Sequence, residues 1–137
     1  MSLKMKIKPK CAGNAGGNAV VEFALVLPIL LLVVFGITEF GRMILTTNIL
    51  NTASREGARL AAVSPAGETA AIEARVNEVL AAGRVHAKTI TVEYLPAANS
   101  VRVTVTTDFD ILSRSVLPSP LRGTIELRGQ TVFRYEG

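Results

Sequence analysis

The sequence contains one cysteine, one histidine and no tryptophan, and each shortage excludes a class of protein. Cys11 alone cannot form a disulfide framework, and Cys11 with His86 cannot supply a Cys/His zinc site or a two-histidine metal centre. Five Phe and two Tyr offer little material for stacking nucleic-acid bases. We therefore expect no metal, no cofactor and no nucleic-acid partner.

The excess of positive charge is confined to one short stretch. The chain has 15 Lys and Arg against 11 Asp and Glu, and four of the lysines lie between Lys4 and Lys10. Without those four the charges balance, so no basic surface for nucleic acid remains. Residues 1–17 are lysine-rich and contain no acid, and we interpret them as a basic leader that neither builds a core nor sustains a helix.

A long apolar run follows the leader. From Ala19 to Ile37 only Glu22 is charged. Its uncharged part would extend about 24 Å as a helix, slightly short of the roughly 30 Å hydrocarbon core of a bilayer. Because the lysines precede the run and the acid and base after it cancel, the N-terminus is expected in the cytoplasm. The predicted organisation is a leader over 1–17, a transmembrane helix over 18–40 and an exported domain over 41–137.

A cleavable secretory signal is the competing interpretation of the same run. The residues that follow it, Phe35 to Phe40, contain no pair of small residues with the A-x-A spacing that signal peptidase requires. A lipoprotein signal at Cys11 is excluded because no apolar stretch precedes that cysteine. The pattern therefore favours a span that ordinary signal peptidase leaves intact.

The helical pattern continues beyond the apolar run. Apolar and small residues recur every three or four positions from Leu45 to Leu60, so one helix is expected from about Asn18 to Val63, with a kink at Pro28. Proline and glycine in the next four residues end it. A second helix is expected from Glu68 to Ala82, with Gly83 directly after its end.

Alternating residues predict strands in the last third of the chain. The alternation covers Thr89–Tyr94 and Val101–Thr106, with a hairpin loop at Pro96–Asn99. Asp108–Arg122 is expected to be irregular, and Gly123–Tyr135 to form a last strand. The fold class predicted is α+β: a long membrane-spanning helix continuing into a small domain with a second helix and an antiparallel sheet of about three strands.

No group of residues resembles an enzyme site. His86 lies in the connection between the second helix and the first strand, without a nucleophile motif. Asp108 and Asp110 flank Phe109 and would point the same way from a strand, with no partner acid, so we interpret them as a solvated strand end. The sequence therefore predicts a protein that is not an enzyme.

Glu22 is the unusual residue, because an acid inside an apolar run costs up to a few kcal/mol even near the bilayer edge. A cut after Gly17 would create an α-amine on Asn18, four residues before Glu22 and one helical turn away on the same face. Amine and carboxylate could then neutralise each other, within one chain or between neighbours. The simpler alternative is that Glu22 is hydrated at the level of the headgroups.

These residues carry a resemblance to a known family. The segment GNAVVEF, Gly17 to Phe23, is similar to the prepilin peptidase site of type IV pilin-like proteins. The runs VEFALVLPILLLVVFGITEFGR and NILNTASREGARLAAV resemble the TadE-like pseudopilins of tight adherence (Flp-type) pilus systems. The resemblance covers about residues 17–63, and the strands only in outline.

The resemblance implies a minor pilin-like subunit of the bacterial inner membrane that helps to build an adhesive, biofilm-promoting pilus. It implies processing by prepilin peptidase and association with other pilin-like subunits and the assembly platform. By this analogy Gly17 is the last leader residue, Asn18 the mature N-terminus, and Glu22 with Phe23 the site used in recognition or assembly. A cut after Gly16 is the alternative. For the whole chain, the alternative is an uncleaved, membrane-anchored envelope sensor or scaffold.

The family motif on the helix is Arg55-Glu56-Gly57-Ala58-Arg59. Glu56 reaches Arg59 at i+3, which favours a surface ion pair worth about 0.2–0.5 kcal/mol. Gly57 costs about 1 kcal/mol relative to alanine inside a helix, so we expect another element, such as the sheet, to approach closely there. A structural role for the motif is favoured over a partner-binding role.

Overall fold

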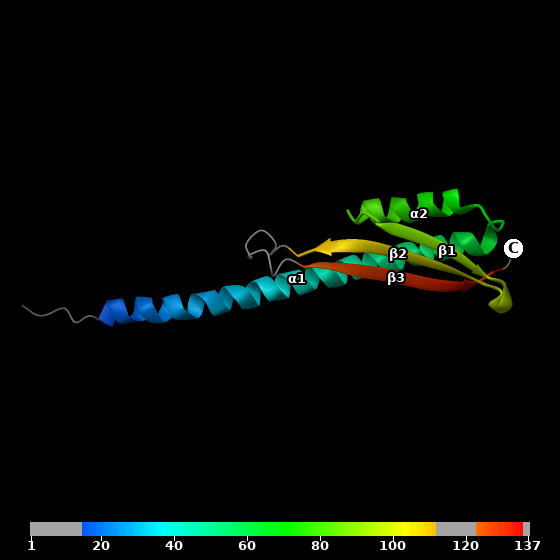
Figure 1. Ribbon diagram of the computed structural model, residues 1–137. Coiled ribbons are helices and arrows are strands. Elements are labelled where there is room, and N and C mark those ends of the chain that lie inside the picture. The colour runs from blue at the N-terminus through cyan, green and yellow to red at the C-terminus, as the bar shows by residue number, and fades with distance from the viewer. Residues whose placement is uncertain (1–14, 112–122, 136–137) are drawn as a thin grey trace, which may run out of the picture. The chain divides into compact units, whose positions relative to one another are not determined.

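The structure is a computed structural model that describes residues 15–111 and 123–135. Its elements follow the order predicted, and they confirm the α+β class (Figure 1). They are α1 (Ala15–Val63), α2 (Thr69–Ala82), β1 (Thr89–Leu95), the short 3₁₀ helix η1 (Pro96–Ala98), β2 (Ser100–Asp110) and β3 (Thr124–Arg134). Contacts divide the chain into an N-terminal unit, Met1–Gly36, and a C-terminal unit, Ile37–Gly137, with α1 running through both.

The N-terminal unit is described from Ala15 onward and consists of α1 alone. Its large apolar side chains are exposed, for example Phe23 at 61% and Leu32 at 73%. Helix α1 is long and apolar enough to cross a membrane, and none of its most apolar stretch is buried in the structure. The helix therefore presents an apolar surface all round, as membrane-spanning helices do.

Helix α1 begins at Ala15, three residues before the predicted start at Asn18. The expectation that the whole of residues 1–17 is non-helical was therefore wrong for the last three. Extending an existing helix fixes one residue per added hydrogen bond, whereas nucleation must fix a whole turn, so glycine-containing flanks can join a long helix. Pro28 lies inside α1, as expected.

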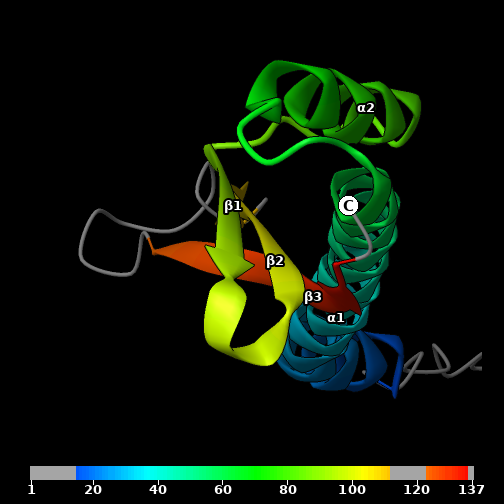
Figure 2. The same ribbon diagram turned by 90° about the vertical axis from the view of Figure 1, so that its right-hand side faces the viewer.

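The C-terminal unit places both helices on one face of the sheet (Figure 2). Small residues on the second half of α1 make the close packing possible, since Ala53, Gly57 and Ala61 are buried. Helix α2 contributes a stripe with four-residue spacing. Its buried members are Ile72, Val76 and Leu80. Together these residues form one side of a single apolar core.

The sheet has the strand order β1-β2-β3 and is antiparallel throughout. Val103 in the central strand lies opposite Val92 in β1 and Thr131 in β3. The odd-numbered residues of β2 are buried from Val101 to Phe109, because their side chains point toward the helices. The other face carries threonines and charged residues, as expected for an antiparallel sheet with one solvated side.

The end of α2 lies where the sequence predicted it, at Ala82. Gly83 follows the helix, as predicted, but has a right-handed φ of −85°, and Arg84 takes the left-handed position with φ 57°. Arg84 and Val85 donate their backbone N–H groups to the carbonyls of Ala81 and Leu80, which closes the helix end. Gly83 is required for a different reason: a Cβ there would meet Ile49 of α1 at 2.8 Å.

The second strand is longer than predicted. β2 continues to Asp110, so Asp108 and Asp110 belong to a strand and not to an irregular segment. Pairing with β3 explains the extension, because Asp110 lies opposite Thr124. The remainder of the segment predicted to be irregular, 112–122, lies outside the described residues.

Candidate functional site

The residues of the predicted processing and assembly site lie on the first turns of α1. Gly17, Asn18, Glu22 and Phe23 are all exposed, and a Cβ built on Gly17 would meet nothing within 4 Å. Asn18 and Glu22 are both helical and four residues apart, so they lie on one face. Within residues 15–111 and 123–135, no side chain forms an ion pair or hydrogen bond with Glu22. This arrangement offers a carboxylate, on an apolar surface, that a cation could neutralise.

The motif on the second half of α1 is divided between two roles. The sequence had suggested an ion pair between Glu56 and Arg59, but Glu56 has a different partner in the structure. Its Oε2 atom lies 3.4 Å from Arg75 of α2, and Arg75 also bonds Glu78 at 2.8 Å. These bonds, first that to Glu78 and then that to Glu56, raise the pKa of Arg75 above its usual value. Glu56 pairs with Arg75 and not with Arg59 because α2 packs beside this turn of α1.

Gly57 allows that packing. A Cβ at this position would lie 2.5 Å from Val76 of α2 and 3.3 Å from Val103 of β2. The expectation of a close approach is therefore confirmed, although the nearer element is α2 and not the sheet. Gly57 and Glu56 thus have structural roles, whereas Arg55 and Arg59 are exposed.

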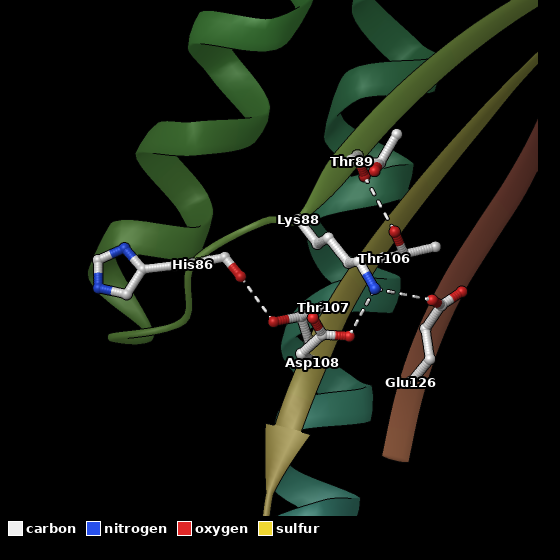
Figure 3. A network of polar contacts seen from close by, with 7 residues as sticks. All are labelled: His86, Lys88, Thr89, Thr106, Thr107, Asp108 and Glu126. Atoms are coloured by element: carbon white, nitrogen blue, oxygen red, sulfur yellow. Dashed lines mark hydrogen bonds and ion pairs between the residues drawn. The ribbon is translucent and has the colours of Figure 1, made fainter. Parts of the chain in front are cut away.

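A polar network links Asp108 of β2 and Glu126 of β3 to Lys88, which directly precedes β1 (Figure 3). Lys88 Nζ donates to Asp108 at 2.9 Å and to Glu126 at 3.4 Å. Thr107 donates its hydroxyl hydrogen to the carbonyl of His86 at 2.6 Å, and the His86 ring points away from the network (Figure 3). Asp108 is therefore tied to a lysine at an exposed strand end, an arrangement that suits anchoring of the segment before β1.

The hydrogen bond from Lys88 to Asp108, and then that to Glu126, raise the pKa of Lys88 above its usual value. A group with a raised folded-state pKa stabilises the fold below its unfolded pKa, and this contribution is lost as the pH rises through the folded pKa. Lys88→Met should therefore lower the midpoint of urea unfolding slightly at pH 7 and less at pH 11. High salt should shrink the difference because the pair is exposed. Equal differences at both pH values would contradict this account.

Arg42 makes two contacts that the sequence did not predict together. Its NH1 atom lies 3.0 Å from Glu39 on α1, and its guanidinium carbon lies 5.2 Å from the centre of the Phe109 ring. The ion pair could be read from the i+3 spacing, whereas the contact with Phe109 joins residues that are distant in the sequence. The ion pair and the ring contact together hold the part of α1 around Arg42 against the end of β2.

Groups that could hold a metal ion are absent from the described ranges, where no three His, Cys, Asp or Glu side chains cluster. The His86 ring does not face Asp108, and Asp108 is bonded to Lys88 (Figure 3).

One comparison with known proteins gives a match, and it lies on α1. Residues 17–59 match the family model described as TadE-like protein. The match begins at Gly17, contains Glu22 and ends at Arg59, so it includes both motifs on α1. No curated protein and no solved structure matches the chain significantly.

Proposed function

Because residues 17–59 belong to the TadE-like family, whose members are associated with the tight adherence (Flp-type) pilus, we propose that this chain is a minor pilin-like subunit for assembly of that pilus. In this role the chain contributes to surface adhesion and biofilm formation and carries out no catalysis. It resides in the bacterial inner membrane, with its N-terminus in the cytoplasm and residues 41–137 exported. Its partners are prepilin peptidase, other pilin-like subunits and the assembly platform.

The observation that carries the proposal is the pairing of Asn18 and Glu22 on one exposed face of an apolar helix. Cleavage after Gly17 converts the backbone nitrogen of Asn18 into an ammonium group. That cation lies one turn from the Glu22 carboxylate, at a distance where opposite charges attract strongly in a medium of low dielectric constant. The leader lysines leave with the same cut, so the remaining helix has no excess charge at its end.

The neutralised helix end then supports lateral association. An unpaired Glu22 is costly in the bilayer, and the α-amine of the same chain or of a neighbour removes that cost. The surrounding large side chains, among them Val20, Phe23 and Val26, are more than half exposed and can pack against other pilin-like helices. Assembly is thereby favoured over an isolated span.

The scissile bond lies in the first turns of α1, so prepilin peptidase must unwind them. Gly16 and Gly17 lower the cost of unwinding, because glycine is a poor helix former and gains backbone freedom when released. This is a physical reason for glycine immediately before the cut.

The processing step is tested by Gly17→Leu, expressed in cells that contain the peptidase. We expect a full-length precursor, because the larger residue replaces glycine at the cleavage position. Intact-mass measurement of membrane extracts reports the cut directly, and the unsubstituted chain should begin at Asn18. Gly36→Ala is the matched control, since a Cβ there also meets nothing within 4 Å.

The same measurement separates the alternatives. Gly16→Leu should leave cleavage after Gly17 intact. Loss of cleavage in that variant alone would show that the cut follows Gly16 and not Gly17. Retention of Lys4 to Lys10 in the unsubstituted chain would exclude the pilin-like role and support an uncleaved envelope sensor or scaffold.

A further inference from the structure

The outward face of α1 stays apolar for about two turns beyond Ile37, where the apolar run ends. Within the C-terminal unit this face carries an apolar stripe at helical spacing, formed by Ile37, Phe40, Ile44 and Leu45. Phe40 is 60% exposed and Leu45 is 61% exposed. Large apolar side chains are common singly on protein surfaces, whereas a contiguous exposed stripe indicates contact with an apolar partner or medium.

The apolar stripe ends within one turn. Asn48 and Thr52 continue the same outward face of α1, and both are polar and exposed. Thr52 follows Leu45 by two turns, so the two side chains point in nearly the same direction. The surroundings to which this face is suited therefore change from apolar to aqueous between Leu45 and Asn48.

The polar side chains beside the stripe are turned toward the protein or bonded within α1. Glu39 and Arg42 form an ion pair of 3.0 Å, and the Arg42 guanidinium carbon lies 5.2 Å from the centre of the Phe109 ring. Thr46 and Thr47 donate their hydroxyl hydrogens to backbone carbonyls one turn earlier, at 3.0 and 2.9 Å. Paired charges and internally bonded hydroxyls are tolerated at a bilayer edge, where a lone charge is costly.

The length of the stripe identifies hydrocarbon as the medium that covers it. The uncharged residues from Phe23 to Thr38 extend about 24 Å, less than the roughly 30 Å core of a bilayer. Along the same helix, the stretch from Phe23 to Leu45 measures about 34 Å, which spans the core with a modest tilt. The stripe also continues the exposed apolar surface of the candidate membrane span without interruption.

We propose that the apolar stripe is a lipid-contacting surface of the C-terminal unit and that the membrane boundary on α1 lies between Leu45 and Asn48. The ion pair of Glu39 and Arg42 then lies just inside this boundary, and the end of β2 at Phe109 lies at the bilayer surface. The C-terminal unit thus rests directly on the membrane. The inference rests on the proposed residence of α1 in the membrane, but it depends neither on cleavage nor on pilus assembly.

The test is spin labelling of the full-length chain in vesicles of phosphatidylethanolamine and phosphatidylglycerol. In a Cys11→Ser background, a nitroxide is attached to a single cysteine in three separate variants, Leu32→Cys, Leu45→Cys and Thr52→Cys. Oxygen concentrates in hydrocarbon and a water-soluble nickel complex is excluded from it, so the ratio of their collision rates reports the medium. We expect this ratio to be severalfold higher at positions 32 and 45 than at position 52, the matched control on the same face.

The three positions distinguish the possible failures. A ratio at position 45 as low as that at 52, with position 32 still in hydrocarbon, would place the stripe in water and overturn the inference while leaving the membrane residence of α1 intact. Few collisions with either reagent at position 45 would show that another protein helix covers the stripe, which would also overturn it. An aqueous position 32 would contradict the membrane residence itself. Circular dichroism of each labelled variant confirms that it is folded.

Discussion

Gly129→Ala is expected to lower the free energy of unfolding of the C-terminal unit by about 3 kcal/mol, the upper part of the usual range for overpacking a core. Gly129 is buried in β3, and a Cβ there would lie 2.5 Å from the carbonyl carbon of Leu50 and 2.6 Å from its oxygen. These are backbone atoms of α1, so no side-chain rotation can relieve the overlap. Strand and helix must separate instead, which breaks contacts along both.

The measurement is urea unfolding of the full-length protein in detergent, followed by circular dichroism. Gly123→Ala is the matched control, because a Cβ at that glycine, directly before β3, meets nothing within 4 Å. Its unfolding midpoint should stay close to that of the unsubstituted chain. A midpoint for Gly129→Ala equal to that of the control would mean that β3 does not lie against α1 at Leu50.

The Glu22→Leu subunit is expected to be cleaved and inserted normally. Pilus assembly should fall by more than about tenfold, the loss expected when one partner of a desolvated charge pair is removed. The variant retains an apolar helix, so membrane insertion should be unchanged or improved. What it loses is the carboxylate that neutralises the α-amine of Asn18. Sheared surface pili, quantified by immunoblot against the major subunit, report assembly, and intact mass reports cleavage.

Val26→Leu provides the control for Glu22→Leu. Val26 lies one turn further along the same face of α1 and is 54% exposed, so a change of size there tests packing without charge. Assembly should persist in this variant. Normal pilus levels in Glu22→Leu would remove the charge pair from the mechanism while leaving the processing site intact.

Much of the fold could be predicted because it depends on local patterns. The alternation of Val101, Val103 and Val105 predicted a half-buried strand, and the structure buries all three. The pattern over Glu68–Ala82 predicted a second helix, and Ile72, Val76 and Leu80 form the buried face of α2. In each case the spacing along the chain determines which side chains share a face.

The errors came from contacts between distant parts of the chain. Glu56 pairs with Arg75, 19 residues away, and this pair cannot be inferred before the packing of α1 and α2 is known. Arg84 takes the left-handed position at the end of α2 because Ile49 requires a glycine one residue earlier. The composition of a helix end predicts the turn but not which neighbour occupies the space beside it.

For the candidate site the sequence indicated which residues share a helix face but not their surroundings. The spacing of Asn18 and Glu22 already implied one face of a helix, and α1 has that geometry. The motif around Gly57 indicated a close approach, but its spacing could not indicate that Glu56 and Gly57 serve the fold while Arg59 borders a groove. That division requires the position of α2.

The contact between α1 and β3 has a consequence for the order in which this protein can mature. Ser54 and Thr131 share a partly buried hydrogen bond of 2.8 Å across 77 residues of sequence. Because β3 follows α1, α2, β1 and β2 in the chain, α1 cannot complete its packing until β3 has been synthesised. If the C-terminal unit is exported as proposed, it therefore completes its core only after β3 has crossed the membrane.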